Sequence, residues 1–202
     1  NYVNLDVQMD SRIALVGANV CGKTTLLKVM MEQLRPTKGF VSRNGRLRIG
    51  YFTQHHVDSM DLTTSAVDWM SKSYPGRTDE EYRRHLGSFG ITGTLGLQKM
   101  ELLSGGQKSR VAFAALCLNN PHILVLDEPS NHLDTTGLEA LVDALRKFTG
   151  GVLMVSHDIA IINDVCNEIW VSENGTVQKF DGDIYGYRDY ILSSANEGGV
   201  VK

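Results

Sequence analysis

Three features are scarce in this sequence of 202 residues, and each scarcity excludes a class of protein. The three cysteines, Cys21, Cys117 and Cys166, are too few and too widely spaced for a disulfide framework, which favours a reducing compartment. No apolar run approaches the roughly 18 residues that a membrane-spanning helix needs. The opening residues also lack the charged-then-apolar pattern of a signal peptide. We therefore expect a soluble, cytoplasmic domain without a membrane partner.

The third feature that the sequence lacks is a large net charge of either sign. The formal net charge is −3, so no domain-wide basic footprint indicates a nucleic-acid-binding protein. Small basic groups such as Arg43, Arg46 and Arg48 are typical of a solvated face, and no direct nucleic-acid patch is evident. With 42% hydrophobic and 21% charged residues, the composition is that of a globular protein and argues against disorder. The length suits one large domain.

The segment from Gly17 to Thr25, GANVCGKTT, carries the clearest functional pattern. The apolar run at 12–16 predicts a buried strand before it, and residues 24–34 continue with apolar residues at helical spacing. Strand, glycine-bounded loop and helix are the context of a phosphate-binding P-loop. Backbone N–H groups and a helix N-terminus would surround a triphosphate, Lys23 would supply a cation, and Thr24 would place a hydroxyl on Mg²⁺.

Along the rest of the chain, apolar strands alternate with amphipathic helices, which predicts an α/β domain with a mostly parallel sheet. Such sheets bind ligands at the carboxyl ends of their strands. A half-buried strand is also expected from Val3 to Met9, as in a domain that is cut at its N-terminal edge. Further strands are expected at 123–126 and 152–155, hairpins at 40–52 and 168–180 around Asn-Gly pairs, and helices at 138–148, 159–165 and 184–193.

Between Leu62 and Met100 the pattern changes to short helices with glycine-rich breaks, which is typical of a small helical insertion. Thr78 and Glu81 form a T-x-x-E capping box at the start of one of these helices. We expect a single domain over residues 1–202, with a core at 1–60 and 101–202 and a helical subdomain at about 61–100. The insertion carries no chemistry that its sequence identifies.

The acidic pair Asp127-Glu128 ends one of the buried strands. In isolation it could be a polar strand end closed by Pro129. Beside a P-loop the pair has a further interpretation, because a carboxylate, a Thr hydroxyl and phosphates are the usual ligands of Mg²⁺. Asp127 would then hold the metal, and Glu128 would orient or deprotonate an attacking water.

The string Ser-Gly-Gly-Gln at 104–107 has two interpretations that can both hold. It forms an S-x-x-Q capping box, and a capped helix N-terminus with two glycines is also an anion site. Gln54 and His157 each follow a strand, where most such residues are structural. His157 could donate a hydrogen bond to a γ-phosphate, and Gln54 could reach Mg²⁺ or the water. The other histidines show no metal-ligand spacing and are expected to be structural: His55, His56, His85, His122 and His132.

In this order, the strings GANVCGKTT, LSGGQ, ILVLDEP, SNHLD and LMVSHD resemble the nucleotide-binding domain of the ATP-binding cassette (ABC) superfamily, over essentially the whole chain. SGGQKSRVAFA and DEPSNHLD are similar to the ABC-F family, whose members are soluble paired-cassette proteins that act on ribosomes and translation. IGYFTQHHVD, YPGRTDEEYRRHLGSFGI and DIYGYRDYIL look closest to the second, C-terminal cassette of the fungal general-control branch, which regulates translation in amino-acid starvation.

The resemblance implies a P-loop NTPase fold with a small helical subdomain and an incomplete N-terminal antiparallel β region. It implies Glu128 as the catalytic base, with Gln54 and His157 sensing the γ-phosphate. The implied Mg²⁺ ligands are Thr24, Asp127 and Gln54. The implied contacts with the chain's own nucleotide are Gly17, Ala18, Asn19, Cys21, Gly22, Lys23, Thr24 and Thr25. The implied contacts with ATP bound to the opposite cassette are Ser104, Gly105, Gly106 and Gln107. Residues 130–134 are implied to cross the dimer interface.

By this resemblance, one chain holds the P-loop half of one nucleotide site and the 104–107 half of another. It holds no complete nucleotide site. ATPase activity is therefore expected to need a second cassette, either the N-terminal cassette of the same protein or a homodimer mate. The isolated domain is expected to be weakly active or inactive. Ribosome and translation-control partners are expected to bind through regions outside this chain. Two alternatives remain: the ATPase subunit of a membrane transporter, and a nucleotide-sensing scaffold without turnover.

The sequence departs from the family pattern in three places. Val20 stands where cassette loops carry glycine, and a β-branched residue there is expected to weaken phosphate binding. Tyr2 is too close to the first strand to be the aromatic residue that stacks on adenine, and the linker of ABC-F proteins is absent.

The thiol of Cys21, in a loop that leads into a helix N-terminus, is expected to be alkylated readily and to be protected by Mg-ATP.

Overall fold

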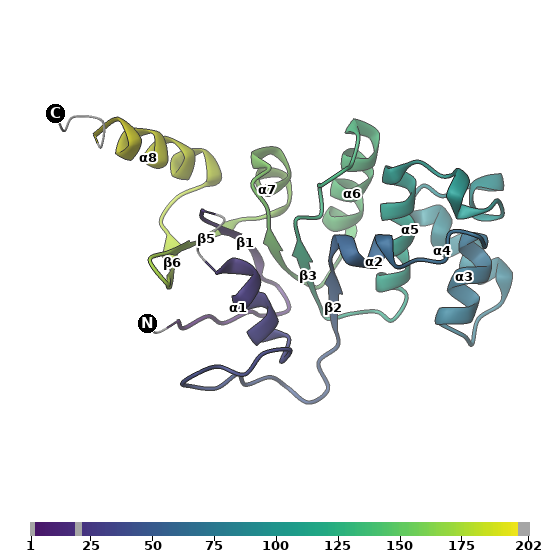
Figure 1. Cartoon of the computed structure of the whole chain (residues 1–202), viewed down its shortest axis with the longest axis horizontal. Helices are drawn as coiled ribbons and strands as arrows, with labels where there is room; N and C mark the ends of the chain where they lie inside the picture. The colour runs from purple at the N-terminus through teal and green to yellow at the C-terminus, as the bar shows by residue number, and fades with distance from the viewer. Residues whose placement is uncertain (1–2, 19–21, 198–202) are drawn as a thin grey trace.

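The computed structural model describes residues 3–18 and 22–197, so the expectations for Tyr2, Asn19, Val20 and Cys21 lie outside the described residues. None of the helices in these ranges combines the length and apolar character that crossing a membrane requires. The elements follow in the order β1 (Arg12–Val16), α1 (Lys23–Met30), β2 (Ile49–Phe52), α2 (Gln54–Asp58), α3 (Ala66–Ser73), α4 (Asp79–Ser88), the 3-10 turns η1 (Gly93–Gly96) and η2 (Met100–Leu102), α5 (Gly105–Cys117), β3 (Ile123–Asp127), α6 (Thr135–Lys147), β4 (Gly151–Val155), α7 (Ile159–Val165), β5 (Glu168–Glu173), β6 (Thr176–Phe180) and α8 (Ile184–Glu197) (Figure 1).

The strands form one sheet in the order β2-β3-β4-β1-β5-β6. All neighbouring pairs are parallel except the hairpin of β5 and β6. That hairpin turns at Asn174 and Gly175, which have φ angles of 50° and 74°, as a tight Asn-Gly turn requires. The predicted α/β fold with a mostly parallel sheet is confirmed.

Different helices cover the two faces of the sheet, because successive residues of a strand point to opposite faces. On one face, Ile13 and Leu15 of β1 pack with Leu27 of α1. On the other face, Ala14 and Val16 belong to a larger core that includes buried residues of α5, α6 and α7. These strand residues are at most 4% exposed. In Figure 1, α1 lies below the strands, and α6 and α7 lie above them.

The predicted helical insertion contains α3 and α4, beyond the β2 end of the sheet (Figure 1). Its two ends lie side by side, since the N–H of Met100 donates to the carbonyl oxygen of Thr64 at 2.9 Å. The predicted capping box forms at α4, where the Thr78 hydroxyl oxygen accepts from the N–H of Glu81 at 3.3 Å. The chain therefore enters and leaves this segment at one point, which leaves the parallel sheet intact.

Two of the strands expected near the N-terminus do not form. Residues 3–9 make no strand, and Val3 and Met9 are 38% and 55% exposed. Residues 40–48, expected as the first half of a hairpin, also make no strand. An alternating sequence stabilises a strand only where a partner strand lies beside it, and the described chain supplies none for these two segments.

The turn at Asn44-Gly45 does form, with the N–H of Leu47 donating to the carbonyl oxygen of Asn44 at 3.0 Å. The residues that follow it join the edge of the sheet as β2, which pairs in parallel with β3. A second boundary also differs, because α1 ends at Met30 rather than at Leu34. Glu32 has a φ of 58°, and a left-handed residue ends a helix.

Candidate functional site

The carboxyl ends of the adjacent strands β2, β3, β4 and β1 bring together most of the residues that the sequence singles out. Asp127, the last residue of β3, lies level with Val155 of β4, which lies level with Leu15 of β1. The P-loop after β1, Glu128 after β3 and His157 after β4 therefore emerge at one edge of the sheet. This is the edge at which open α/β sheets bind ligands.

The P-loop starts and ends at glycines whose backbones have positive φ angles. Gly17 has a φ of +140°, and a Cβ atom there would lie 2.3 Å from the carbonyl oxygen of Ser172 in β5. Gly22 has a φ of +78° and precedes α1. Lys23 is 5% exposed, and its Nζ donates to the carbonyl oxygens of Gly17 at 2.5 Å and Ala18 at 3.0 Å. The ammonium group thus lies beside the first two residues of the loop, and its role as a phosphate-binding cation stays a prediction.

The first turn of α1 fits an anion. In the described part of the chain it has neither a side-chain cap at Gly22 nor an acidic residue, and Thr24 and Thr25 are exposed. The first N–H groups of a helix have no intrahelical partner, and the helix dipole is positive at this end. A phosphate group would accept hydrogen bonds from these N–H groups, and its negative charge would interact favourably with the helix dipole. The predicted contacts of Asn19 and Cys21 lie outside the described residues and stay predictions.

Asp127 is half-buried near two lysines. Burial raises the pKa of its carboxyl group, and the charges of Lys23 and Lys28 lower it. The pKa of the Tyr51 hydroxyl, on neighbouring β2, is raised by burial and then by the charge of Asp127. Within the described ranges no three His, Cys, Asp or Glu residues gather as metal ligands. A divalent cation at Asp127 would therefore take further oxygens from a hydroxyl and from phosphates, as Mg²⁺ commonly does.

Glu128 combines backbone strain with an unsatisfied oxygen atom. Its φ is +48°, and its N–H donates to the carbonyl oxygen of Val155 at 2.8 Å. Its Oε1 lies 2.9 Å from Nε2 of His157, whereas Oε2 is buried and finds no hydrogen-bond partner among the described atoms. Burial raises the pKa of the Glu128 carboxyl group, and His157 lowers it. A strained backbone and a buried unpaired oxygen favour a functional residue over a simple polar strand end.

His157 is held by the residues on either side of it. The N–H of Asp158 donates to Oγ of the buried Ser156 at 3.0 Å, and Oδ1 of Asp158 accepts from two N–H groups in the first turn of α7. The imidazole between them is 60% exposed and reaches Glu128. Sequence reasoning missed this role of Asp158, although Asp before an apolar helical run is a known N-cap signal.

Gln54 is not brought to the carboxylates. It follows β2 at the same edge of the sheet, but it begins α2, and its Nε2 donates to Oδ1 of Asp58 at 3.3 Å, one turn further along. A capping box fixes this helix, because Nδ1 of His56 accepts from the N–H of Thr53 at 3.2 Å. Gln54 follows a strand as expected, and a contact with Mg²⁺ or water would need another rotamer of its side chain.

Residues 104–107 form the predicted capping box at the start of α5. Oγ of Ser104 accepts from the N–H of Gln107 at 3.1 Å, and Oε1 of Gln107 accepts from the N–H of Ser104 at 2.9 Å. Figure 1 shows α5 beyond the edge strand β2, whereas α1 lies below β1, three strands further along the sheet. These residues therefore lie apart from Lys23 of the same chain.

The second glycine of this string has a packing role that the sequence did not reveal. A Cβ atom on Gly106 would lie 3.1 Å from Oδ1 of Asp134 and 3.6 Å from Cα of Gly137. The same Oδ1 caps α6, where it accepts from the N–H of Gly137 at 2.8 Å. A Cβ atom on Gly105 would meet the carbonyl oxygen of His132 at an ordinary 3.6 Å. Gly106 thus allows α5 to pack on α6, while Gly105 is exposed to solvent.

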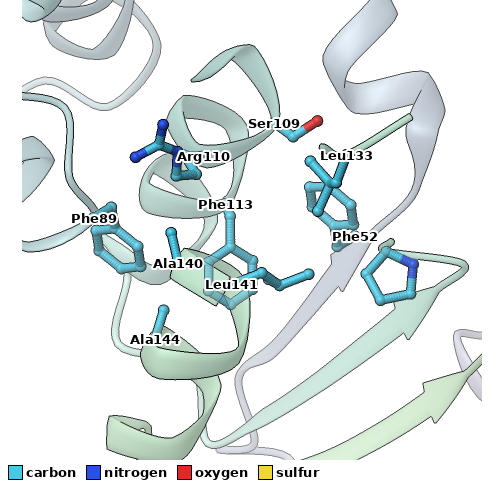
Figure 2. Close-up of a pocket in the computed structure, with 10 residues that line it drawn as sticks. Phe52, Phe89, Ser109, Arg110, Phe113, Leu133, Ala140, Leu141 and Ala144 are labelled. Carbon is cyan, nitrogen blue, oxygen red and sulfur yellow. The ribbon is translucent and has the colours of Figure 1, made fainter. Parts of the chain in front are cut away.

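A small apolar pocket lies behind the turn that follows Glu128. Figure 2 shows side chains from β2, α5, α6 and this turn around it, including Phe52, Phe113 and Leu133. Its volume is about 10 Å³, which is roughly the space of one water molecule. The pocket cannot take a nucleotide base. Its function is packing, because Pro129 and Leu133 line it and anchor the turn to the core.

Comparisons with known proteins agree with this arrangement. The family model described as "ABC transporter" matches residues 1–131. The chain is 86% identical over 200 residues to Protein GCN20 of Saccharomyces cerevisiae, an alignment that covers 99% of the chain and 27% of that protein. It is 47% identical over 199 residues to ATP-binding cassette sub-family F member 3 of Homo sapiens, covering 98% of the chain and 28% of that protein. The chain thus spans about a quarter of the length of these relatives.

Among solved structures, the chain resembles the dimeric post-hydrolysis state of the ATP-binding cassette MJ0796 bound to ADP and Pi. The TM-score is 0.71 at 23% sequence identity, with 89% of this chain and 90% of that chain covered. At this identity the likeness shows the shared fold.

Proposed function

The chain belongs to the ABC-F family of ATP-binding cassettes, and from this premise we propose that it binds Mg²⁺-ATP and hydrolyses it as one of a pair of cassettes. The observation that carries the proposal is the convergence of Lys23, Glu128 and His157 at one edge of the sheet, with Glu128 Oε1 2.9 Å from His157 Nε2. We also propose that residues 1–202 form one domain, with a core at 1–60 and 101–202 and a helical subdomain at about 61–100.

Lys23 and the first turn of α1 would hold the phosphates. Nζ of Lys23 is directed into the loop by two carbonyl oxygens, and a phosphate oxygen is a charged and therefore stronger acceptor. The N–H groups of the first turn would share the negative charge. Bound Mg²⁺, with Thr24 and Asp127 as protein ligands, would neutralise charge on the phosphates.

Glu128 is the residue best placed to accept the proton of an attacking water. Its Oε2 is buried and, among the described atoms, has no hydrogen-bond donor to compete with such a proton. Burial raises the pKa of the carboxyl group, which makes it a stronger base than an ordinary glutamate. His157, at Oε1, would fix the orientation of the carboxylate and present its imidazole to the γ-phosphate.

A second cassette would complete the site. Residues 104–107 are exposed or half-exposed except for Gly106, and α5 lies away from α1. They therefore have no nucleotide to contact within their own chain, whereas two cassettes facing each other would place one chain's 104–107 at the other chain's P-loop. The partner would be the N-terminal cassette of a longer protein or a second copy of this chain.

We infer that the whole protein acts in the cytoplasm in translation, as a ribosome-associated regulator in amino-acid starvation. The support is the similarity of the strings IGYFTQHHVD, YPGRTDEEYRRHLGSFGI and DIYGYRDYIL to the general-control branch of the ABC-F family. Contacts with translation-control proteins would lie in regions outside this chain.

Calorimetric titration with ATP and Mg²⁺ tests the nucleotide site. The wild-type chain should bind, and Lys23→Ala should weaken binding by about 100-fold, as expected when a charge-assisted phosphate contact of a few kcal/mol is lost. Lys72→Ala, which removes an exposed lysine of α3, is the control and should bind like the wild type. Equal affinity of the Lys23→Ala and wild-type chains would contradict the proposal.

Hydrolysis is tested with the Glu128→Gln variant. The variant should bind ATP like the wild type but lose at least about 100-fold in turnover, the usual contribution of a general base. Full turnover with glutamine would exclude Glu128 as the base. A further titration with Val20→Gly checks whether valine weakens binding, in which case the variant binds more tightly.

A further inference from the structure

The last turn of α5 directs a backbone donor away from a carbonyl oxygen in the core. The helix ends with a tightened turn, in which the N–H of Leu118 donates to the carbonyl oxygen of Ala115 at 3.2 Å. In a regular α-helix this N–H would donate to Ala114, four residues back. Ala114 is 0% exposed, and a carbonyl oxygen left unpaired in the core costs stability. A donor from outside the helix is therefore needed at Ala114.

His85 of α4 supplies that donor. Its Nε2 lies 2.7 Å from the carbonyl oxygen of Ala114, and because a carbonyl oxygen only accepts, the hydrogen atom is on Nε2. Burial lowers the pKa of the His85 imidazole, and the bond to Ala114 opposes this shift without cancelling it. The ring is therefore neutral at about pH 7, and its N–H is directed at Ala114.

Neighbouring contacts join the same two helices. The ring centroids of His85 and Phe89 are 5.2 Å apart, and those of Phe89 and Phe113 of α5 are 5.7 Å apart (Figure 2). Just before α4, the guanidinium group of Arg77 donates to the carbonyl oxygen of Leu118 at 2.9 Å. A cation is favourable at this end of a helix, where the dipole is negative. The start and the end of α4 are thus both fastened to the C-terminal half of α5.

The N-terminal end of α5 carries residues 104–107, and the helical subdomain leads directly into them. The subdomain ends at η2, which stops two residues before this string. At its root, the N–H groups of Met100 and Glu101 donate to carbonyl oxygens before α3 at 2.9 Å. A body that is joined at its root alone can turn about that root, whereas the contacts of α4 with α5 supply a second attachment. The orientation of the subdomain, and of the string that continues from it, therefore depends on His85.

We propose that His85 is a positioning residue for the half-site that this chain offers to the opposite cassette. Its hydrogen bond to Ala114 fixes the helical subdomain on α5 and thereby holds residues 104–107 in the orientation that meets the other cassette's ATP. The inference rests on the proposed function, in which this string completes the site of a second cassette. The chain's own P-loop follows β1, three strands away from the β2 end of the sheet where α4 lies (Figure 1). Loss of the bond should therefore lower turnover and leave the binding of Mg²⁺-ATP to the chain unchanged.

Two amide side chains of different reach test the hydrogen bond. The amide nitrogen of glutamine can take the place of Nε2, whereas the amide nitrogen of the shorter asparagine does not reach Ala114. Phosphate release by His85→Asn should fall about 10-fold or more, because small misplacements of a catalytic contact are costly. His85→Gln should keep most of the wild-type rate, and calorimetric titration should give both variants the wild-type affinity for Mg²⁺-ATP. Arg84→Gln, which changes the exposed neighbour of His85 on α4, is the control and should behave like the wild type.

Mixing with the Lys23→Ala variant assigns the defect to one half-site. In a mixed pair, the P-loop of the His85→Asn chain meets the undamaged string of the Lys23→Ala chain, which completes one site of two. For a 10-fold defect, random pairing predicts that an equimolar mixture hydrolyses ATP about 3-fold faster per chain than His85→Asn alone. A defect at the chain's own P-loop, or a general loss of structure, predicts a rate about 2-fold lower than that of His85→Asn alone.

The role of His85 is overturned if His85→Asn keeps the wild-type rate, or if its affinity for Mg²⁺-ATP falls together with its rate. It is also overturned if His85→Gln is as slow as His85→Asn, or if the mixture is slower than His85→Asn alone. A reference mixture of Lys23→Ala with Gly105→Asp, which alters the string directly, separates this failure from that of the proposed function. If the reference mixture regains activity, only the role of His85 is refuted, and if it does not, the shared site itself is refuted.

Discussion

If each nucleotide site is shared between two cassettes, two inactive variants of this chain should restore activity when they are mixed. We propose Lys23→Ala, which disables the P-loop half-site, and Gly105→Asp, which places a negative charge on the half-site that faces the other chain's ATP. Each variant alone forms pairs in which both sites contain one damaged half. In a mixed pair, the P-loop of the Gly105→Asp chain meets the intact 104–107 string of the Lys23→Ala chain, and this site is complete.

The space around Gly105 and Gly106 determines which of these two glycines should be substituted. A Cβ atom on Gly105 has its nearest contact at 3.6 Å, with the carbonyl oxygen of His132, so an aspartate at this exposed position fits without displacing its neighbours. Asp is also favourable in the first turn of a helix. A side chain on Gly106 would be 3.1 Å from Asp134 Oδ1, and its effect on activity could not be separated from its effect on folding.

The size of the effect follows from pairing statistics. Random association of an equimolar mixture gives about half mixed pairs, each with one complete site of two, so the mixture should reach about a quarter of the wild-type rate. Each variant alone should fall at least about 100-fold, since an essential electrostatic contact is lost. Phosphate release at a chain concentration where the wild-type rate per chain has reached its plateau measures both quantities. A mixture no more active than its two components would refute the shared site, provided that both variants fold.

Three further outcomes are expected. Gly17→Ala should lower the free energy of unfolding in urea by about 3 kcal/mol or more, because its Cβ atom would meet the backbone of β5 at 2.3 Å in a conformation with a φ of +140°. Burial raises the pKa of Asp127, so its ionised form costs stability when the pH is above that raised pKa. Asp127→Asn should therefore melt at a higher temperature than the wild type at about pH 7, and the difference should shrink as the pH falls through the raised pKa and be absent below the ordinary value of 3.8. Burial raises the pKa of the thiols of Cys117 and Cys166 to about 12, so mass spectrometry after iodoacetamide treatment at about pH 8 should find alkylation at Cys21 alone. Mg-ATP should slow that reaction, and equal rates with and without nucleotide would contradict a site at the P-loop.

The sequence predicted those parts of the fold whose stabilising partners are local or strongly patterned. The hairpin at Asn174-Gly175 and the helix from Ile159 to Val165 form as expected, because a turn type and a strong N-cap specify them within a few residues. The alternation from Val3 to Met9 was just as regular and makes no strand. Alternation reports which side of a strand would be buried, and it carries no information on whether a neighbouring strand is present to bury it.

Some features of the candidate site could likewise be predicted from the sequence, and others could not. That Glu128 and His157 meet could be anticipated, because both follow buried parallel strands and such strands end at one edge of the sheet. That Gln54 turns along α2 towards Asp58 could not, because the competing hydrogen bond is four residues away on a helix that the apolar pattern does not mark. The capping residues Asp134 and Asp158 were readable from sequence as N-caps, but their contacts with the site depend on packing.

Asp134 shows why packing matters for the proposed mechanism. Its Oδ1 holds the first turn of α6 through Gly137 N–H at 2.8 Å, and it lies against Gly106 at the start of α5. The turn leading to it begins at Glu128, whose carbonyl oxygen accepts from the N–H of Asn131 at 3.2 Å. One short, anchored path of chain therefore runs from the proposed base of a chain's own half-site to the string that it offers to the other chain.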